Sequence, residues 1–168
     1  MQLIRCTKKL QKEMGLTKTL LTDDEPTFSY LGPWHANLIY IDRRKCILLV
    51  NDKTLLNFII PDVSRAQIKH LPELFRSLLV CVLAEENIPE SVRHKILAEY
   101  TDIGFTNTNS KSVLGSMNDL AFHYEHHILS EGGIHSHAIP GIISKLNHMP
   151  MGAIEYAYSI DALKKLYL

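Results

Sequence analysis

The chain has 168 residues, of which 46% are hydrophobic and 21% are charged, a composition that suits one globular domain with a sizeable core. Its 18 basic and 18 acidic residues balance, which excludes the overall electrostatic field of a protein that binds nucleic acid or acidic membranes over a broad surface. The 3 cysteines lie in or beside apolar runs, which favours buried thiols in a reducing compartment over a disulfide framework. We therefore expect a single domain over residues 1–168 in the cytoplasm, with no secretory leader and no membrane-spanning segment.

The first part of the chain predicts a short strand, a short helix and a long loop. Gln2–Thr7 is typical of a strand, and Lys8–Met14 predicts a basic helix that ends at Gly15. Residues 16–33 contain Asp-Asp-Glu-Pro and Leu-Gly-Pro, which are typical of a surface loop. We expect this loop to be the most mobile segment of the protein.

A three-stranded antiparallel meander forms the apolar centre of the sequence. Ala36–Ile41 and Cys46–Val50 are rich in β-branched and aliphatic residues, and the charged segment between them predicts the tip of a β-hairpin. A second turn precedes a third strand, Thr54–Ile60. The first two runs do not alternate between apolar and polar residues, so we expect these strands to be buried on both faces.

The second half of the chain predicts helices that cover this sheet. Pro72–Glu86 has apolar residues at steps of three and four, which predicts the main core helix, packed across the sheet. Ile103 and Phe105 alternate with polar residues and suggest a further strand. The expected fold class is α+β, with an antiparallel sheet centred on a three-stranded meander (about 36–60) covered by several helices. Further helices are predicted at 89–100, 112–133, 140–146 and 160–166.

Three sequence segments resemble those of an uncharacterised bacterial family of small proteins, a domain of unknown function. They are LGPWHANLIYIDRRKCILLVNDKT, TNSKSVLGSMNDLAFH and KLNHMPMGA. The resemblance spans nearly the whole chain, and its first segment is long and specific, whereas its last is short. It implies no established activity, cofactor or catalytic residue, so the function has to be inferred from the residues themselves.

Polar residues at the Trp34 end of the hairpin are candidates for a ligand site. A hairpin loop centred on Arg43-Arg44 pairs Ile41 with Cys46, and this register brings a histidine opposite an aspartate. The carboxylate would orient the imidazole, while an indole and two amides nearby offer stacking and hydrogen bonds. The alternative is a polar pair that only ties the end of the sheet together. The candidate ligand-binding residues are Trp34, His35, Asn37, Asn51 and Asp52.

The most conspicuous polar cluster is a histidine-rich segment in and after the predicted helix 112–133. Two histidines four residues apart on a helix can share a metal ion, but the sequence has neither an HExxH motif nor matched cysteine pairs. The alternative interpretation is the solvated face of an amphipathic helix. The candidate metal ligands are Asp119, His123, His127, His135 and His137.

Two places have the chemistry of an anion site. Ser110 and Ser112 lie at a predicted helix start, where free backbone N–H groups and the helix dipole favour an anion, although ordinary capping explains the same residues. Arg43 and Arg44 at the hairpin tip have guanidinium groups suited to phosphate, although a charged tip is more often only a soluble turn. No P-loop or dinucleotide-binding motif accompanies either place.

These observations favour a small cytoplasmic binding or interaction module, and they leave open whether the protein is an enzyme. One alternative is a metal-dependent hydrolase or nuclease that uses the histidine-rich region 119–137. Another is nucleic-acid binding through Arg43 and Arg44, although the sequence has no strong nucleic-acid signature. The sequence implies no particular cofactor, assigns no catalytic residue and predicts no membrane partner. A second copy of the chain and a different protein both stay open as partners.

Overall fold

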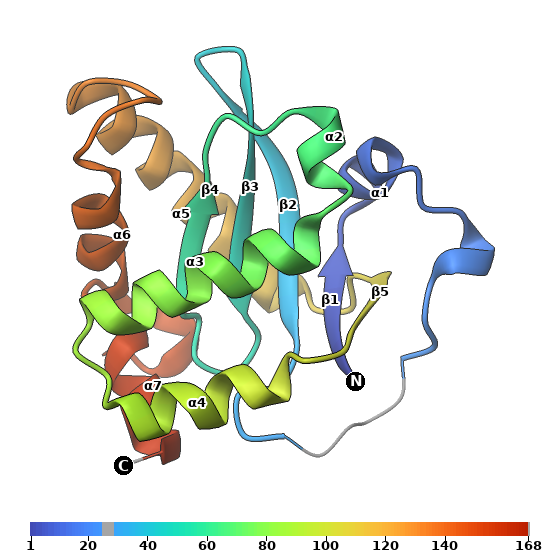
Figure 1. The fold of residues 1–168 in the computed structure, drawn as a ribbon. Helices are drawn as coiled ribbons and strands as arrows, with labels where there is room; N and C mark the ends of the chain where they lie inside the picture. Colours follow the sequence, from blue (N-terminus) through green and yellow to red (C-terminus); the bar gives the residue numbers. More distant parts are fainter. Residues whose placement is uncertain (25–28, 168) are drawn as a thin grey trace.

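The computed structural model describes residues 1–24 and 29–167. The expected mobile loop at 16–33 therefore lies partly outside the described residues, at 25–28. The main sheet has five strands in the order β4–β3–β2–β1–β5 (Figure 1). In chain order they are β1 (Gln2–Cys6), β2 (Trp34–Ile41), β3 (Arg44–Asn51), β4 (Asn57–Ile60) and β5 (Ile103–Asn107).

The α+β class and the β2–β3–β4 antiparallel meander are confirmed. The sheet as a whole is mixed, because β1 runs parallel to both β2 and β5. The expectation of an antiparallel sheet is therefore wrong for the β1–β2 and β1–β5 pairs. A tight turn enforces antiparallel pairing, whereas the long connections that lead from β1 to β2 and from β4 to β5 permit parallel pairing. All five residues of β1 are buried, as in a parallel strand covered on both faces.

The β2–β3 hairpin turns through two residues, Asp42 and Arg43, whose φ angles are 49° and 63°. Both are left-handed, as a type I′ turn requires, but the sequence lacks the Asn-Gly pair that usually marks such a turn. Ile41 therefore pairs with Arg44 rather than with Cys46, and the expected register is wrong by two residues. A shift of two keeps each side chain on its expected face. In the observed register His35 lies opposite Val50, Asn37 opposite Leu48, and Asn51 opposite Trp34.

Helices cover both faces of the sheet, with α3 and α4 in front of it and α5 behind it (Figure 1). The predicted core helix is α3, and it packs across the sheet as expected. Beyond the main sheet, the short strands β6 (Pro150–Met151) and β7 (Ala157–Tyr158) pair with each other, and 3₁₀ turns lie at Lys18–Leu20 and Gly152–Ile154. The helices are α1 (Lys8–Met14), α2 (Arg65–Ile68), α3 (Leu71–Glu85), α4 (Glu90–Glu99), α5 (Lys111–Ser130), α6 (Ile139–Asn147) and α7 (Ser159–Tyr167).

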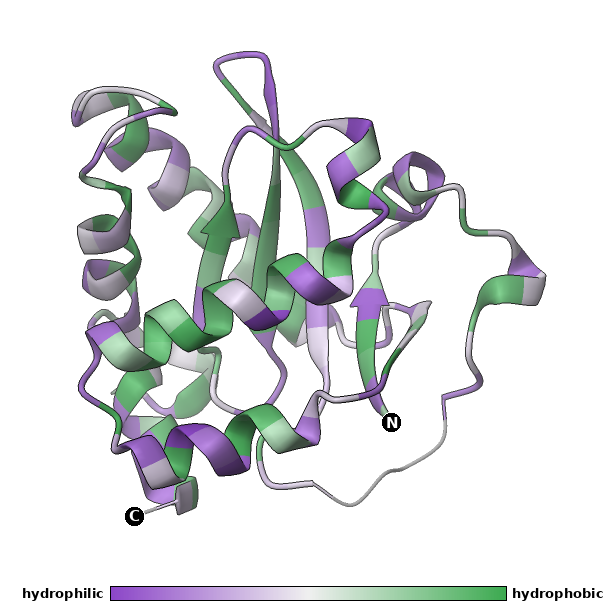
Figure 2. Ribbon diagram, in the orientation of Figure 1, coloured by the Kyte–Doolittle hydropathy of each residue, from purple (hydrophilic) through white to green (hydrophobic). Residues whose placement is uncertain are grey.

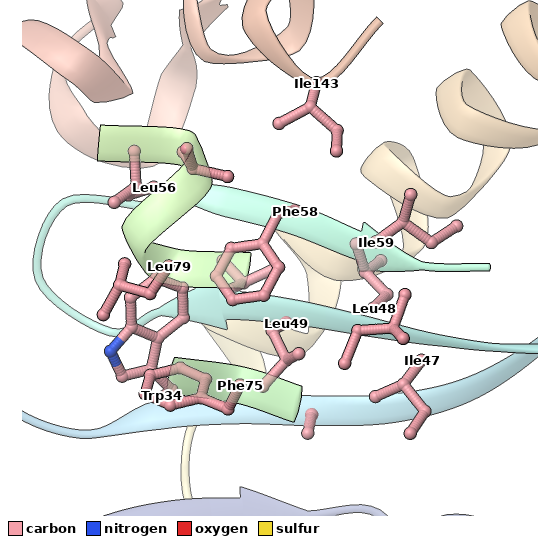
Figure 3. Close-up of a cluster of buried hydrophobic side chains, with 14 of the residues drawn as sticks. Trp34, Ile47, Leu48, Leu49, Leu56, Phe58, Ile59, Phe75, Leu79 and Ile143 are labelled. Carbon is pink, nitrogen blue, oxygen red and sulfur yellow. The ribbon is translucent and has the colours of Figure 1, made fainter. Parts of the chain in front are cut away.

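An aromatic cluster fills the space between the sheet and α3 (Figure 3). The centroid of the Trp34 ring lies 5.2 Å from that of Phe75 and 5.5 Å from that of Phe58, both edge to face. Trp34 Nε1–H donates to Tyr100 Oη at 2.9 Å, and the Tyr100 hydroxyl donates to Gly32 O at 2.6 Å. Beneath the cluster, β3 is hydrophobic along most of its length (Figure 2). This face is the apolar core that the sequence predicts.

The opposite face carries a row of residues across the whole sheet that is polar on every strand except β3. Asn57, Val50, His35, Arg5 and Thr106 lie in register on β4, β3, β2, β1 and β5. All of them are buried. The polar members of this row therefore need hydrogen-bond partners from the segments that cover this face.

At the β4 end of the row, α5 and α6 supply those partners. Asn57 Oδ1 accepts a hydrogen bond from the Tyr124 hydroxyl at 2.6 Å. The Asn147 carboxamide accepts from Asn57 N at 2.9 Å and donates to Asn57 O at 2.8 Å. The Asn147 side chain thus pairs with the backbone of β4 as a further strand would, and it blocks this edge of the sheet against pairing with another strand.

Tyr124→Phe should lower the free energy of unfolding by about 1–3 kcal/mol, because Asn57 Oδ1 loses its hydroxyl partner inside the protein. The Tyr124 side chain is fully buried, and this burial raises its pKa, so the hydroxyl remains a donor near neutral pH. Urea denaturation measures the effect. Tyr156→Phe, at a residue that is 76% exposed, is the control. Equal stability of the two variants would contradict the prediction.

Candidate functional site

β1 and β5 are parallel neighbours whose carboxyl ends lie side by side, with Cys6 opposite Asn107. β1 leads into α1, and β5 leads into α5 behind the sheet (Figure 1). α1 lies on the α3 side, because Lys9 Nζ is 5.8 Å from the ring centroid of Tyr40, which shares a face with Trp34. Parallel neighbours that continue into helices on opposite faces leave a crevice at their carboxyl ends, where open α/β sheets bind ligands.

A hollow of about 380 Å³ lies at this edge of the sheet, and we call it the β1–β5 crevice. One wall is the strap, residues 16–24, which runs beside β5 and donates from Thr22 N to Phe105 O at 2.7 Å. Gly104 permits this approach, since a Cβ there would lie 2.7 Å from Thr22 Oγ1. Most of the lining side chains are polar, among them Lys8, Lys18, Asp24, Thr106 and Asn109.

A charged cluster adjoins the crevice, and we call it the Arg5 cluster: Arg5, Asp24, His35, Asp52 and Asn109. Arg5 Nη2 donates to Asp24 Oδ1 at 2.8 Å, and Arg5 Nε donates to Asp52 Oδ2 at 3.3 Å. Asn109 Nδ2 donates to Asp24 Oδ2 at 3.3 Å. Because Asp24 and Asn109 also line the crevice, the cluster connects the crevice to the buried polar row.

His35 is fully buried, and both nitrogens of its ring have partners. Nδ1 lies 2.7 Å from Asp52 Oδ1, and Nε2 faces the backbone N–H of Asn109 at 3.4 Å. A backbone N–H can only donate, so in this arrangement Nε2 accepts and Nδ1–H donates to Asp52. The expected contact between His35 and Asp52 is therefore present. It forms because Asp52 follows the end of β3, and not because the two residues are cross-strand partners.

The hydrogen bond from the Arg5 guanidinium holds the pKa of the Asp24 carboxyl below its usual 3.8, against the opposing effect of burial. A lowered pKa in the folded state means that this ion pair stabilises the protein above pH 3.8, and that the contribution is lost as the pH falls through the lowered value. The strap should therefore detach from Arg5 only below pH 3.8. The pH dependence of the NMR signals of the backbone amides at positions 22 and 24 measures this detachment. If the same pH-dependent change occurs in Asp24→Asn, it belongs to another carboxyl group.

The sequence model of a family described as a domain of unknown function, DUF6933, matches residues 3–162. The chain belongs to this family. The match confirms the resemblance to an uncharacterised family, whose description names no activity, ligand or cofactor. A comparison with curated proteins finds no match. None of the helices within the described ranges is long and apolar enough to cross a membrane.

Three of the candidate ligand residues have their polar groups engaged within the protein. Trp34 is buried on the α3 face, away from His35. Asn51 is fully buried, and its carboxamide accepts from backbone N–H groups after β3 and donates to backbone carbonyls before β2. Asn37 Oδ1 accepts from the threonine hydroxyl at the start of α1 at 2.7 Å. The other two candidates, His35 and Asp52, belong to the Arg5 cluster.

Arg5, Asp24 and Asn109 complete the cluster, and neither Arg5 nor Asp24 was among the candidates from the sequence. A signal for Arg5 was available, because a single charged residue in the run Leu3-Ile4-Arg5-Cys6 has to find a partner once the strand is buried. Asp24 has no such local signal, since its partner Arg5 is 19 positions away in the chain. Only the path of the strap brings the two together.

Two of the four candidate anion residues, Ser110 and Arg44, have local partners. Ser110 caps α5 by accepting from Val113 N at 3.2 Å, and Ser112 is exposed. Arg44 Nη1 lies 3.8 Å from a carboxylate oxygen of Asp62, and Arg43 lines the same shallow hollow. A carboxylate beside the two arginines weakens the positive potential that phosphate or nucleic acid would need.

The structure does not bring the candidate metal ligands together. The His123 and His127 rings stack on α5 with centroids 6.5 Å apart, whereas His135 Nε2 lies 3.4 Å from a carboxylate oxygen just before α2. Asp119 lines a separate hollow beside His123, and within the described residues His137 belongs to no cluster that could hold a metal ion. Across residues 1–24 and 29–167, no group of three or more His, Cys, Asp or Glu side chains could hold a metal ion.

Proposed function

We propose that this chain is a binding module for a small polar ligand that occupies the β1–β5 crevice. The observation that carries the proposal is Arg5 Nη1, which is buried and has no hydrogen-bond partner among the residues that the structure describes. The other two nitrogens of the guanidinium are paired. An unpaired buried N–H group destabilises a fold by about 1–3 kcal/mol, so a function that uses it is a natural explanation.

The proposed ligand presents an acceptor oxygen to Arg5 and further hydrogen-bonding groups to the crevice walls. Lys8 and Lys18 balance Asp23 and Asp24 among the lining residues, so hydrogen bonding selects the ligand more strongly than net charge does. A volume of about 380 Å³ suits a compact molecule. Neutral or zwitterionic compounds such as sugars and amino acids match these requirements.

The same geometry favours binding over catalysis. A general base has to reach the proton that it abstracts, whereas the His35 ring is fully buried and engaged at both nitrogens. In this proposal His35 positions Asp52, and Asp52 in turn orients Arg5 toward the ligand.

Titration of the ¹⁵N-labelled protein with small sugars, amino acids and inorganic phosphate tests the proposal. We expect a neutral or zwitterionic probe to shift the amides of Lys8, Thr22 and Thr106 together, and phosphate to bind more weakly. Thr106→Val replaces a hydroxyl that lines the crevice with a methyl of similar shape, and it should weaken binding about tenfold.

Ser112→Ala, at an exposed residue outside the crevice lining, is the matched control and should bind as the wild type does. Shifts that map away from the crevice would contradict the proposal. Equal affinity of Thr106→Val and the wild type would do the same.

A further inference from the structure

A second hollow, of about 210 Å³, lies between α3 and α6, and we call it the α3–α6 groove. It shares no lining residue with the β1–β5 crevice. Leu78, Val82 and Ile143 give it aliphatic walls, and Cys81 and Glu86 border the same space. The volume corresponds to about seven groups the size of a water molecule, which is enough for a small organic compound.

The Glu86 side chain is a buried carboxylate beside this apolar space. It is 7% exposed, and Glu86 Oε2 lies 3.5 Å from His148 Nε2. Glu86 Oε1 is buried and has no hydrogen-bond partner in the described part of the chain. A buried carboxylate oxygen is stable only when a donor or a cation compensates it.

The surroundings of Glu86 increase the demand for positive charge. Glu86 caps the carboxyl end of α3, where the free carbonyl groups of the helix already create a negative potential. Glu85 also lines the groove and adds a second carboxylate. A positively charged ligand is therefore favoured here, whereas an anion is disfavoured.

His148 does not supply the missing donor. Its Nδ1 lies 2.8 Å from Ser144 O, a carbonyl that can only accept, so Nδ1 carries a proton. The other nitrogen faces Glu86 Oε2. Whether or not that nitrogen carries a proton, Glu86 Oε1 stays unpaired.

We propose that the α3–α6 groove binds a small organic amine, whose ammonium group donates to Glu86 Oε1 while its hydrocarbon body packs against Leu78, Val82 and Ile143. The charged head and the apolar body of such a ligand match the two chemical halves of the groove. This site does not depend on the ligand proposed for the crevice.

Three probes of similar shape and different charge test the proposal: 2-phenylethylamine, 2-phenylethanol and 3-phenylpropionate. Cys81 is a built-in reporter, because it is exposed in the groove, whereas Cys6 and Cys46 are buried. Burial raises the pKa of the Cys6 thiol to about 12 and also raises that of Cys46, which keeps both unreactive. The rate at which 4,4′-dithiodipyridine reacts with Cys81 therefore reports occupancy.

We expect the amine to slow this reaction several-fold and to shift the amides of α3 and α6, while the alcohol binds weakly and the carboxylate does not bind. Glu86→Gln removes the charge and keeps the shape, and it should weaken amine binding about tenfold. Glu90→Gln is the control, because Glu90 is an exposed carboxylate outside the groove lining, and it should leave amine binding unchanged.

Equal protection by the amine and the carboxylate would overturn the proposal, as would unchanged amine affinity in Glu86→Gln. If Glu86→Gln does not fold, the comparison of the three probes on the wild-type protein decides by itself. Loss of binding in Thr106→Val would concern the crevice alone, so the two proposals fail separately.

Discussion

Asp52→Ala should lower the free energy of unfolding by about 3–5 kcal/mol, because removal of one partner leaves buried polar groups and charge uncompensated. Asp52 joins the fully buried His35 to the buried Arg5. Among the described residues, Arg5 in this variant keeps only Asp24, whose side chain is 48% exposed, and His35 Nδ1–H loses its acceptor. A loss of this size is a large part of the total stability of an ordinary domain.

Chemical denaturation followed by far-UV circular dichroism measures this effect. Asp52→Asn keeps the shape and one acceptor oxygen for His35, so its effect should be smaller than that of alanine. Asp23→Ala removes an exposed carboxylate in the strap and should change stability by less than about 0.5 kcal/mol. If Asp52→Ala unfolds like Asp23→Ala, the Arg5 cluster does not stabilise the fold.

Trp34→Ala should lower the free energy of unfolding by about 3–5 kcal/mol through the cavity that it opens in the core. The Trp34 side chain is fully buried and packs on Phe58 and Phe75. Its Nε1–H is also a partner of the Tyr100 hydroxyl. If Trp34 instead only stacked on a ligand at the end of the sheet, Trp34→Ala would cost little stability and would weaken ligand binding.

Phe122→Ala is the control for this substitution, because Phe122 is an aromatic residue that is 70% exposed. Its replacement should change stability by less than about 0.5 kcal/mol. Trp34→Phe separates the two contributions, since it keeps most of the ring volume and removes the indole donor. Thermal denaturation of the three variants gives the comparison, and a Trp34→Ala protein as stable as the wild type would contradict the assigned core role.

Local patterns were enough to predict the elements that have either a continuous apolar run or a strong helical period. The apolar run of β3 predicts a strand buried on both faces, and Cys46–Val50 is buried throughout, whereas in β2 the same expectation is wrong at Tyr40, which is 49% exposed. The steps of three and four in α3 predict a helix that packs across these strands. The same reasoning placed His35 near Asp52, since the error of two residues in the register preserved the face of each side chain. It did not reveal that Trp34 would lie in the aromatic core, while His35 would lie in the polar row on the opposite face of the sheet.

The sequence by itself determined the elements, their buried faces and the antiparallel meander, because these depend on residues that are close along the chain. Only the tertiary structure decided the direction of β1, the pairing of β1 with β5 and the Arg5 cluster. Arg5 meets partners 19 and 47 positions away, and no periodicity links such distant residues. The long connections allow β1 and β5 to pair in parallel, so the carboxyl end of β1 lies beside the carboxyl end of β5 and next to the strap. This arrangement creates both the crevice and the buried charges beside it.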